Sequence, residues 1–225
     1  MSLYGIDVSY AQGNIDWTQV VTDKDFAIVR AGYGRNNIDA KAANNVSECN
    51  RLNFPVGLYW FSYAYTVQMA EDEGTYATQF ASSYNLNYPI YWDFEYDSLT
   101  YAENHGVTMT TQLFHAMMNA FCTAVENAGY DSGIYYNPDF DSRYSIASFF
   151  QQYPSRSKWV AKWSTTPPAD YNIWQYGISN AGDVPGISGQ VDLDVIDGTP
   201  VPPTPPTPTP TNDGKMPIWF YLRPY

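Results

Sequence analysis

Short apolar segments alternate along the chain with longer amphipathic ones. Eight of the short segments are rich in β-branched and aromatic residues and are bounded by turn-forming residues, so each predicts a β-strand. The predicted strands are residues 3–8, 26–31, 56–63, 90–95, 133–136, 159–163, 173–176 and 190–195.

The longer segments that follow the first five strands have helical periodicity. The clearest is residues 109–128, in which Leu113, Met117, Phe121 and Val125 recur at four-residue spacing. Weaker or shorter helical patterns cover residues 14–23, 39–52 and 139–152. Residues 66–84 predict a further helix that directs Met69, Tyr76 and Phe80 toward the core and has Glu71, Asp72 and Glu73 among its outward positions.

The last two gaps between strands are different, because residues 164–168 and 180–189 are rich in Pro, Gly, Ser and Asn and predict loops. Alternating strands and helices indicate a parallel sheet with covered faces, and eight strands favour closure into a barrel. We therefore expect an α/β fold: a single (β/α)5(β)3 barrel of eight mostly parallel strands in residues 1–198. Chemistry in such barrels gathers at the carboxyl ends of the strands.

Residues 199–211 consist of Pro and Thr with one Val, a composition that favours an extended polyproline spacer. Residues 212–225 are too few to fold alone but include an apolar run at 218–222. We interpret them as a short C-terminal tail, either the start of a lost module or a docking segment.

The composition excludes some functions. Eleven basic and 23 acidic residues give a net charge of −12, which repels polyanions, so nucleic acid is an improbable partner. The 21 Tyr, 11 Phe and 7 Trp exceed what core packing suggests and hint at a carbohydrate site, since aromatic faces stack on sugar rings. No run of 18 apolar residues and no leader pattern is present, so we expect neither membrane insertion nor a signal peptide.

Cofactor chemistry has no support in the sequence. There is no H-E-x-x-H motif, no Cys/His cluster, no G-x-S-x-G elbow and no phosphate-binding glycine loop. Cys49 and Cys122 lie in helical patterns, where buried thiols are expected. We therefore predict no metal site and no cofactor.

The segment 88–97 carries the most informative pattern, because acidic and aromatic residues alternate in it. In an extended strand Asp93 and Glu95 share one face with Asp97, while Trp92 and Phe94 point the other way. Like charges roughly 6.7 Å apart oppose each other's ionisation, and apolar surroundings keep one carboxyl protonated. A protonated acid beside an ionised one suits glycosidic bond hydrolysis; the alternative is a solvated polar face.

Other residues are expected at the same end of the barrel. Asp7 ends the first predicted strand, and Asp192 and Asp194 alternate on the eighth, which neighbours the first in a closed barrel. Arg30 either balances nearby acids or holds a substrate carboxylate. Four aromatic residues near strand ends serve either as core or as sugar contacts: Tyr63, Tyr135, Trp163 and Trp174.

Taken in order, these motifs resemble glycoside hydrolase family 25, the Chalaropsis-type lysozymes common among phage endolysins. The resemblance is carried by GIDVS at 5–9, FAIVRAG at 26–32, GLYWF at 57–61, WDFE at 92–95, GIYY at 133–136, WQY at 174–176 and VDLD at 191–194.

The resemblance implies a five-plus-three β/α barrel that cleaves the β-1,4 bond between N-acetylmuramic acid and N-acetylglucosamine in bacterial peptidoglycan. It implies that Glu95 is the general acid and Asp93 its partner, with Asp7 and Asp192 as flanking carboxylates and Asp192 preferred to Asp194. Without a signal peptide, release through phage holin-type lysis is expected. The alternatives are a chitinase-like hydrolase and a glycan-binding barrel without catalysis.

Overall fold

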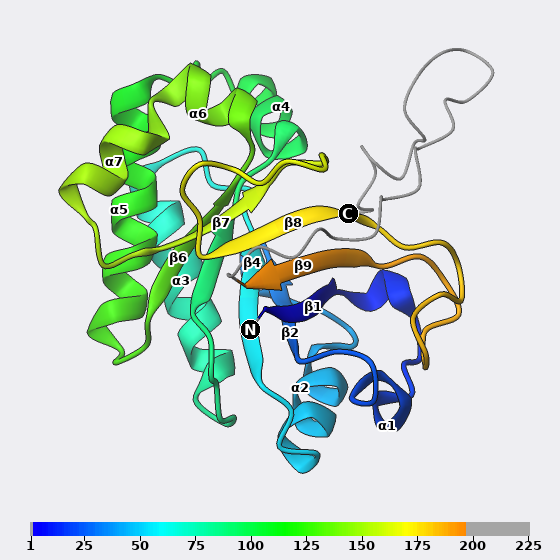
Figure 1. The fold of residues 1–225 in the computed structure, drawn as a ribbon. Helices are drawn as coiled ribbons and strands as arrows, with labels where there is room; N and C mark the ends of the chain where they lie inside the picture. The colour runs from blue at the N-terminus through cyan, green and yellow to red at the C-terminus, as the bar shows by residue number, and fades with distance from the viewer. Residues whose placement is uncertain (1, 197–225) are drawn as a thin grey trace.

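The computed structural model describes residues 2–196 and shows a closed barrel (Figure 1). Within those residues, eight strands form the wall, and the two-residue strand β3 (Asn37–Ile38) pairs with β2 beside it. The wall strands are β1 (Leu3–Val8), β2 (Phe26–Tyr33), β4 (Val56–Phe61), β5 (Ile90–Asp93), β6 (Ser132–Tyr136), β7 (Ser157–Ala161), β8 (Ile173–Ile178) and β9 (Asp192–Ile196). The predicted eight-stranded α/β barrel is confirmed.

The strand order explains how the first and last strands meet. From β1 through β2, β4, β5, β6 and β7 to β8, neighbouring strands are parallel. Strand β9 lies between β8 and β1 and is antiparallel to both. Its amino end is therefore at the carboxyl ends of the other strands, an end of the barrel that we call the mouth.

Helices follow each of the first five predicted strands. They are α1 (Trp17–Val20), α2 (Ala42–Arg51), α3 (Val67–Ala81), α4 (Tyr96–Asn104), α5 (Thr111–Asn127), α6 (Pro138–Tyr144) and α7 (Ile146–Gln152), with a 3-10 turn at Tyr10–Gln12. Residues 162–172 and 179–191 contain no helix, as the turn-rich sequence predicted. Figure 1 shows α3, α5 and α7 beside one part of the wall and α1 and α2 beside another.

Several details of the helices and strands differ from the sequence expectation. The segment between β5 and α5 forms the separate helix α4, which the periodicity did not reveal. The predicted helix at 139–152 is two helices, because Ser145 adopts a left-handed backbone with φ of 52°. Strand β7 ends at Ala161, so Trp163 lies beyond it rather than in it.

Two apolar layers lie on opposite sides of the barrel wall. The interior layer includes Phe26, Tyr59, Tyr91 and Trp159. These rings fit because glycines face them: a Cβ at Gly5 would lie 2.4 Å from the Phe26 ring.

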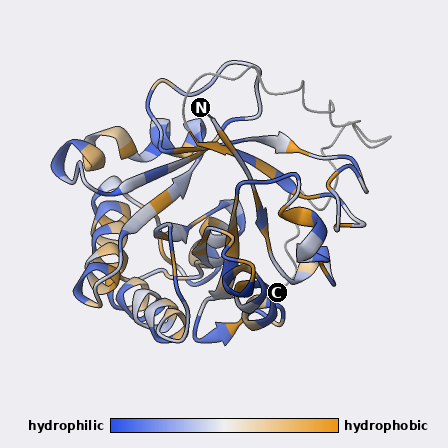
Figure 2. Cartoon of the chain, turned by 60° about the horizontal axis from the view of Figure 1, so that its bottom comes forward, coloured by the Kyte–Doolittle hydropathy of each residue, from blue (hydrophilic) through white to orange (hydrophobic). Residues whose placement is uncertain are grey.

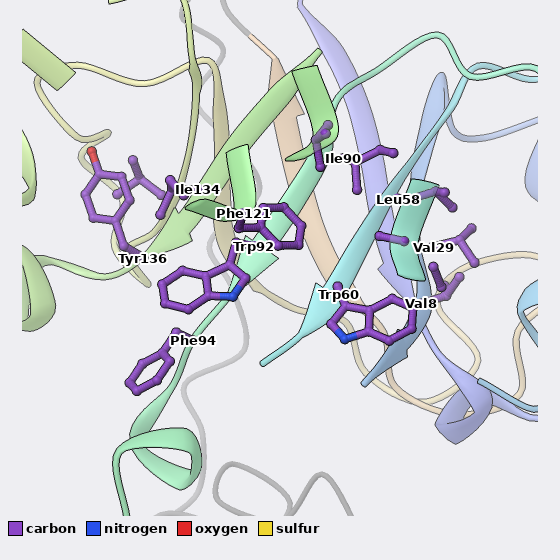
Figure 3. Close-up of a cluster of buried hydrophobic side chains, with 14 of the residues drawn as sticks. Val8, Val29, Leu58, Trp60, Ile90, Trp92, Phe94, Phe121, Ile134 and Tyr136 are labelled. Carbon is purple, nitrogen blue, oxygen red and sulfur yellow. The ribbon is translucent and has the colours of Figure 1, made fainter. Parts of the chain in front are cut away.

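The outer layer, between wall and helices, includes Val29, Leu58, Trp60, Trp92 and Ile134 (Figure 3). Figure 2 shows that apolar residues recur in the strands, while the surrounding helices combine polar and apolar ones. Each strand thus alternates between the two layers.

Helix α3 approaches α5 through small residues. A Cβ at Gly74 would lie 2.8 Å from the Phe121 carbonyl oxygen, so the two helices touch there. The buried face of α3 includes Ala70, Gly74 and Ala77, and it also includes Glu73. The expectation that Glu73 points outward was wrong, because it occupies the same helical face as these small residues.

The expected spacer at 199–211 and tail at 212–225 lie outside the described residues, as do the last two residues of the expected domain 1–198. Cys49 and Cys122 are buried free thiols, as expected. Among residues 2–196, no helix has the length and apolar character needed to cross a bilayer.

Candidate active site

Three strands bring carboxyl groups to the mouth of the barrel. Asp7 lies near the carboxyl end of β1, Asp93 is the last residue of β5, and Asp192 is the first residue of β9. Asp7 and Asp192 are register partners in the β1–β9 ladder. The reversed direction of β9 is what brings Asp192 to this end.

The segment from Tyr91 to Glu95 alternates between the two layers. Tyr91 belongs to the interior layer, whereas Trp92 and Phe94 pack outward against Phe114. Glu95 retains an extended backbone, with φ −118° and ψ −173°, so its side chain follows that of Asp93 rather than that of Phe94. Figure 3 shows Trp92 and Phe94 grouped with Phe121.

The predicted alternation fails at the next acid. Asp97 lies in the first turn of α4, so it is a helical residue and not part of a strand. Its Oδ2 accepts a hydrogen bond of 2.7 Å from the Tyr63 hydroxyl. Tyr63 follows β4, and its ring packs 5.0 Å from that of Tyr101.

Backbone hydrogen bonds fix the segment that carries the two acids. The Ser62 N–H donates to the Asp93 carbonyl oxygen at 2.7 Å. Glu95 is the N-cap of α4, and its N–H donates to Ser98 Oγ at 3.0 Å. Asp93 is buried and Glu95 is partly exposed, so the two carboxyl groups have different surroundings.

A hydrogen-bonded chain crosses the barrel beneath the mouth. Gln175 Nε2 donates to Asp7 Oδ2 at 2.7 Å, and the Tyr135 hydroxyl donates to Gln175 Oε1 at 3.0 Å. Tyr135 is the register partner of Asp93 on the neighbouring strand. These hydrogen bonds therefore link β1 to β6, the strand beside Asp93. The central residue of these hydrogen bonds, Gln175, was not singled out from the sequence. It lies two residues after the interior residue Ile173 in β8 and therefore points to the same side of the wall.

Asp194 lies deeper in the barrel than Asp192. It is fully buried, and its Oδ1 accepts a hydrogen bond of 2.7 Å from Trp159 Nε1. Burial, followed by the nearby Asp7 carboxylate, raises the pKa of Asp194 well above its ordinary value.

Glu73 is a second buried acid, behind the β4 and β5 ends. Its Oε1 accepts from the Tyr63 N–H at 2.9 Å, and its Oε2 accepts from Trp92 Nε1 at 3.0 Å. Burial raises the pKa of Glu73 to about 7, even though hydrogen bonds from neighbouring groups oppose the shift. The small residues Ala70 and Ala77, one helical turn away on either side, share its buried face.

The expected sugar contacts lie in three different places. Tyr63 and Tyr135 belong to the interior layer. Trp163 is partly exposed, two residues beyond the end of β7. Trp174 instead packs in the outer layer, where its Nε1 donates to the Lys162 carbonyl oxygen at 2.7 Å.

Arg30 has a partner within the protein. It is buried, and its guanidinium contacts Asp39 Oδ2 at 2.7 Å through both Nε and a terminal nitrogen. The guanidinium also lies 5.0 Å from the Tyr10 ring centroid. Of the two roles expected for Arg30, the geometry favours balancing an acid.

The family profile described as glycosyl hydrolases family 25 matches residues 6–187, which is most of the chain. The chain belongs to glycosyl hydrolases family 25. This family 25 chain is thus a glycoside hydrolase, as the ordered motifs implied.

Relatives of the family 25 chain include proteins known by function. Lysozyme M1 of Streptomyces globisporus is 28% identical over 214 residues, which cover 87% of this chain and 68% of that protein. The modular autolysin LytC of Streptococcus pneumoniae, solved in complex with a synthetic peptidoglycan ligand, superposes with a TM-score of 0.72 at 27% identity. That match covers 86% of this chain but 46% of LytC, so this chain spans less than half of the autolysin.

The fold also matches that of the bacterial lysozyme from Streptomyces coelicolor, with a TM-score of 0.68 and 23% identity. This match covers 88% of the present chain and 93% of that one. At this identity the likeness concerns the fold, and it extends over nearly the whole of the Streptomyces coelicolor chain.

Proposed function

We propose that this chain is a lysozyme-type hydrolase that cleaves the β-1,4 bond between N-acetylmuramic acid and N-acetylglucosamine in bacterial peptidoglycan. The observation that carries the proposal is the extended Asp93-Phe94-Glu95 segment, whose two acids follow one face at the mouth where Asp7 and Asp192 are paired. The relatives named a lysozyme and an autolysin support the same substrate.

In this proposal Glu95 is the general acid. It protonates the departing glycosidic oxygen while positive charge develops at the anomeric carbon of the muramic acid. Its partial exposure suits a group that has to contact substrate and then regain a proton from water. Asp7 and Asp192 are the flanking carboxylates.

Asp93 is proposed to assist from the same side of the sugar. Retaining enzymes that use a carboxylate nucleophile place it about 5 Å from the acid, on the other side of the scissile bond. Two acids that alternate on one segment serve one face of the sugar instead. We therefore favour a route in which the 2-acetamido oxygen of the substrate attacks the anomeric carbon while Asp93 orients and polarises the amide.

Attack by water, activated by Asp7 or Asp192, is the competing route. The assisted route retains configuration and first yields the β-anomer, whereas direct attack by water inverts it and yields the α-anomer. NMR of the product before mutarotation distinguishes them. An initial α-product would exclude the assisted route.

Substrate contacts are proposed for Tyr63, Tyr135 and Trp163, aromatic residues that lie at or just beyond the ends of β4, β6 and β7. Trp174 is left out because it lies in the outer layer, and Arg30 is left out because Asp39 occupies its guanidinium. The bacterial cell wall is accordingly the proposed place of action.

The decisive experiment is digestion of purified peptidoglycan, followed by borohydride reduction and mass spectrometry of the new reducing ends. Cleavage on the proposed bond yields reduced muramic acid ends. Reduced glucosamine ends, or hydrolysis of chitin oligomers with no action on peptidoglycan, would contradict the proposal.

Two variants, each lacking one carboxyl group of the wild-type enzyme, are compared in this digest. Glu95→Gln keeps the shape of the side chain and removes its transferable proton, so we expect nearly complete loss of hydrolysis with sedimentation onto peptidoglycan preserved. Glu103→Gln changes an exposed acid at the other end of α4 and is expected to leave turnover unchanged. A fully active Glu95→Gln enzyme would overturn the role of Glu95.

A further inference from the structure

The buried acid Glu73 belongs to α3, outside the mouth, yet it contacts both segments that frame the proposed acid pair. One oxygen accepts from the Tyr63 N–H, on the segment after β4. The other accepts from Trp92 Nε1, one residue before Asp93. A single carboxyl group thus joins the ends of two neighbouring strands.

These contacts form part of a closed ring. From Glu73 the ring runs through Trp92 along the chain to Asp97, passing Asp93 and Glu95 on the way. The Tyr63 hydroxyl closes it, because it donates to Asp97 Oδ2 at 2.7 Å while the N–H of the same residue donates to Glu73. Both proposed catalytic acids, Asp93 and Glu95, therefore lie between Trp92 and Asp97, whose side chains these hydrogen bonds hold in place.

The hydrogen bonds of the ring suit a carboxyl group at this position. Two N–H donors point at Glu73, and each of its two oxygens accepts one of them. An amide in the same place would direct its NH₂ group against one of those donors. The position is fully buried, so water cannot replace the lost partner.

The surrounding packing leaves Glu73 little freedom to move. Gly74 brings α3 against the backbone of α5, and the Trp92 ring packs against Phe94 and Phe114. Displacement of the carboxyl group is thus transmitted to Trp92 and to the Asp93 that follows it.

We propose that Glu73 is a positioning residue for the acid pair, holding Asp93 and Glu95 in working geometry through Trp92 on one side and through Tyr63 and Asp97 on the other. This inference rests on the proposed function. Glu73 touches no substrate, so its loss affects turnover rather than binding. A displacement of about 1 Å at reacting groups costs on the order of 100-fold in rate.

The test compares Glu73→Gln with Glu71→Gln, an exposed acid on the same helix. With soluble uncrosslinked peptidoglycan strands as substrate, we expect Glu73→Gln to lower kcat by about 10- to 100-fold with KM within about twofold of wild type. In ¹⁵N NMR spectra the Trp92 Nε1–H resonance is expected to move upfield as its carboxyl acceptor is lost. Glu71→Gln is expected to change none of these quantities.

A second variant tests the opposite side of the ring. Tyr63→Phe removes one hydroxyl group and keeps the backbone bond to Glu73, so it decides the matter if Glu73→Gln does not fold. Positioning predicts a lower kcat for this variant as well. A wild-type kcat in folded Glu73→Gln or in Tyr63→Phe, or an effect of Tyr63→Phe on KM alone, would overturn the proposal.

Failure of this inference is distinguishable from failure of the proposed function. If the wild-type enzyme releases no reducing ends from peptidoglycan, the proposed function fails and the role of Glu73 fails with it. If the wild-type enzyme is active and Glu73→Gln matches it, only the positioning role is refuted.

Discussion

Asp7 and Asp192 are register partners on antiparallel strands, although they belong to the first and last strands of the barrel. Asp194, two residues further along β9, is the partner of Gly5 and lies deeper. The two aspartates of β9 therefore occupy different levels: one at the mouth and one in the interior.

This difference predicts opposite outcomes for two conservative substitutions. Asp194→Asn keeps the shape of a side chain that is buried below the mouth and whose oxygen still accepts from Trp159, so we expect activity within about threefold of wild type. Asp192→Asn removes a charge beside the proposed reacting sugar, and we expect a loss of about tenfold or more. Peptidoglycan clearing rates measure both. The reverse order of effects would assign the flanking role to Asp194.

The Arg30 and Asp39 pair predicts a loss of stability rather than of binding. Arg30→Met leaves the Asp39 carboxylate buried without its cation, which costs about 3–5 kcal/mol of unfolding free energy. Urea denaturation measures this loss. Arg51→Met, which removes an exposed partner of Glu48, serves as the control and is expected to cause no measurable change. Unchanged stability with a raised KM would instead show that Arg30 binds a substrate carboxylate.

Glu73 predicts a specific dependence of stability on pH. Burial raises its pKa from 4.5 to about 7, so between these values the folded state holds a proton that the unfolded state has released. Unfolding free energy therefore falls as pH rises through this window, by about 3 kcal/mol in total, and is constant with respect to this group above it.

To isolate this contribution, the unfolding free energies of wild type and Glu73→Gln are measured by denaturant titration from pH 4 to pH 8. The value for Glu73→Gln is then subtracted from that for wild type at each pH. The difference in unfolding free energy is expected to decline across the window and then to level off. A difference that is independent of pH would contradict the raised pKa.

Helices α3 and α5 approach closely at Gly74, which predicts that a larger residue there lowers stability. A methyl group there meets the Phe121 carbonyl oxygen at 2.8 Å and the Ala124 Cβ at 2.9 Å, so Gly74→Ala forces the helices apart and costs about 1–3 kcal/mol. Gly189→Ala, whose added methyl group has no neighbour within 4 Å, is the control. Thermal unfolding compares them, and equal melting temperatures would show that the interface adapts without cost.

The sequence predicted the barrel and the facing of Asp93 and Glu95 because both follow from alternation, which is a local property of the chain. A side chain two positions from Tyr91 in an extended segment has to share its side of the wall. The same pattern did not predict that β5 stops at Asp93 and that Asp97 is helical, since helix α4 begins through capping at Glu95 and Ser98.

Strand direction was not predictable from the apolar pattern, because alternation is the same whichever way a strand runs. The informative signal was the connection at residues 179–191, which contains no helix and suits an antiparallel return better than a parallel crossover. Glu73 was missed for another reason. An acidic residue in a helix is ordinarily exposed to solvent. Only the tertiary structure shows that Tyr63 and Trp92 each donate a hydrogen bond to Glu73.

The reversed last strand has a practical consequence at the floor of the barrel. Leu3 and Ile196 are partners in the β1–β9 ladder, at the end remote from Asp7 and Asp192. A short peptide can join these two positions, and new termini can be opened in a helical connection to give a circular permutant. Anchoring a variant to a solid support through the same region would leave its carboxylate-bearing end turned toward an incoming glycan.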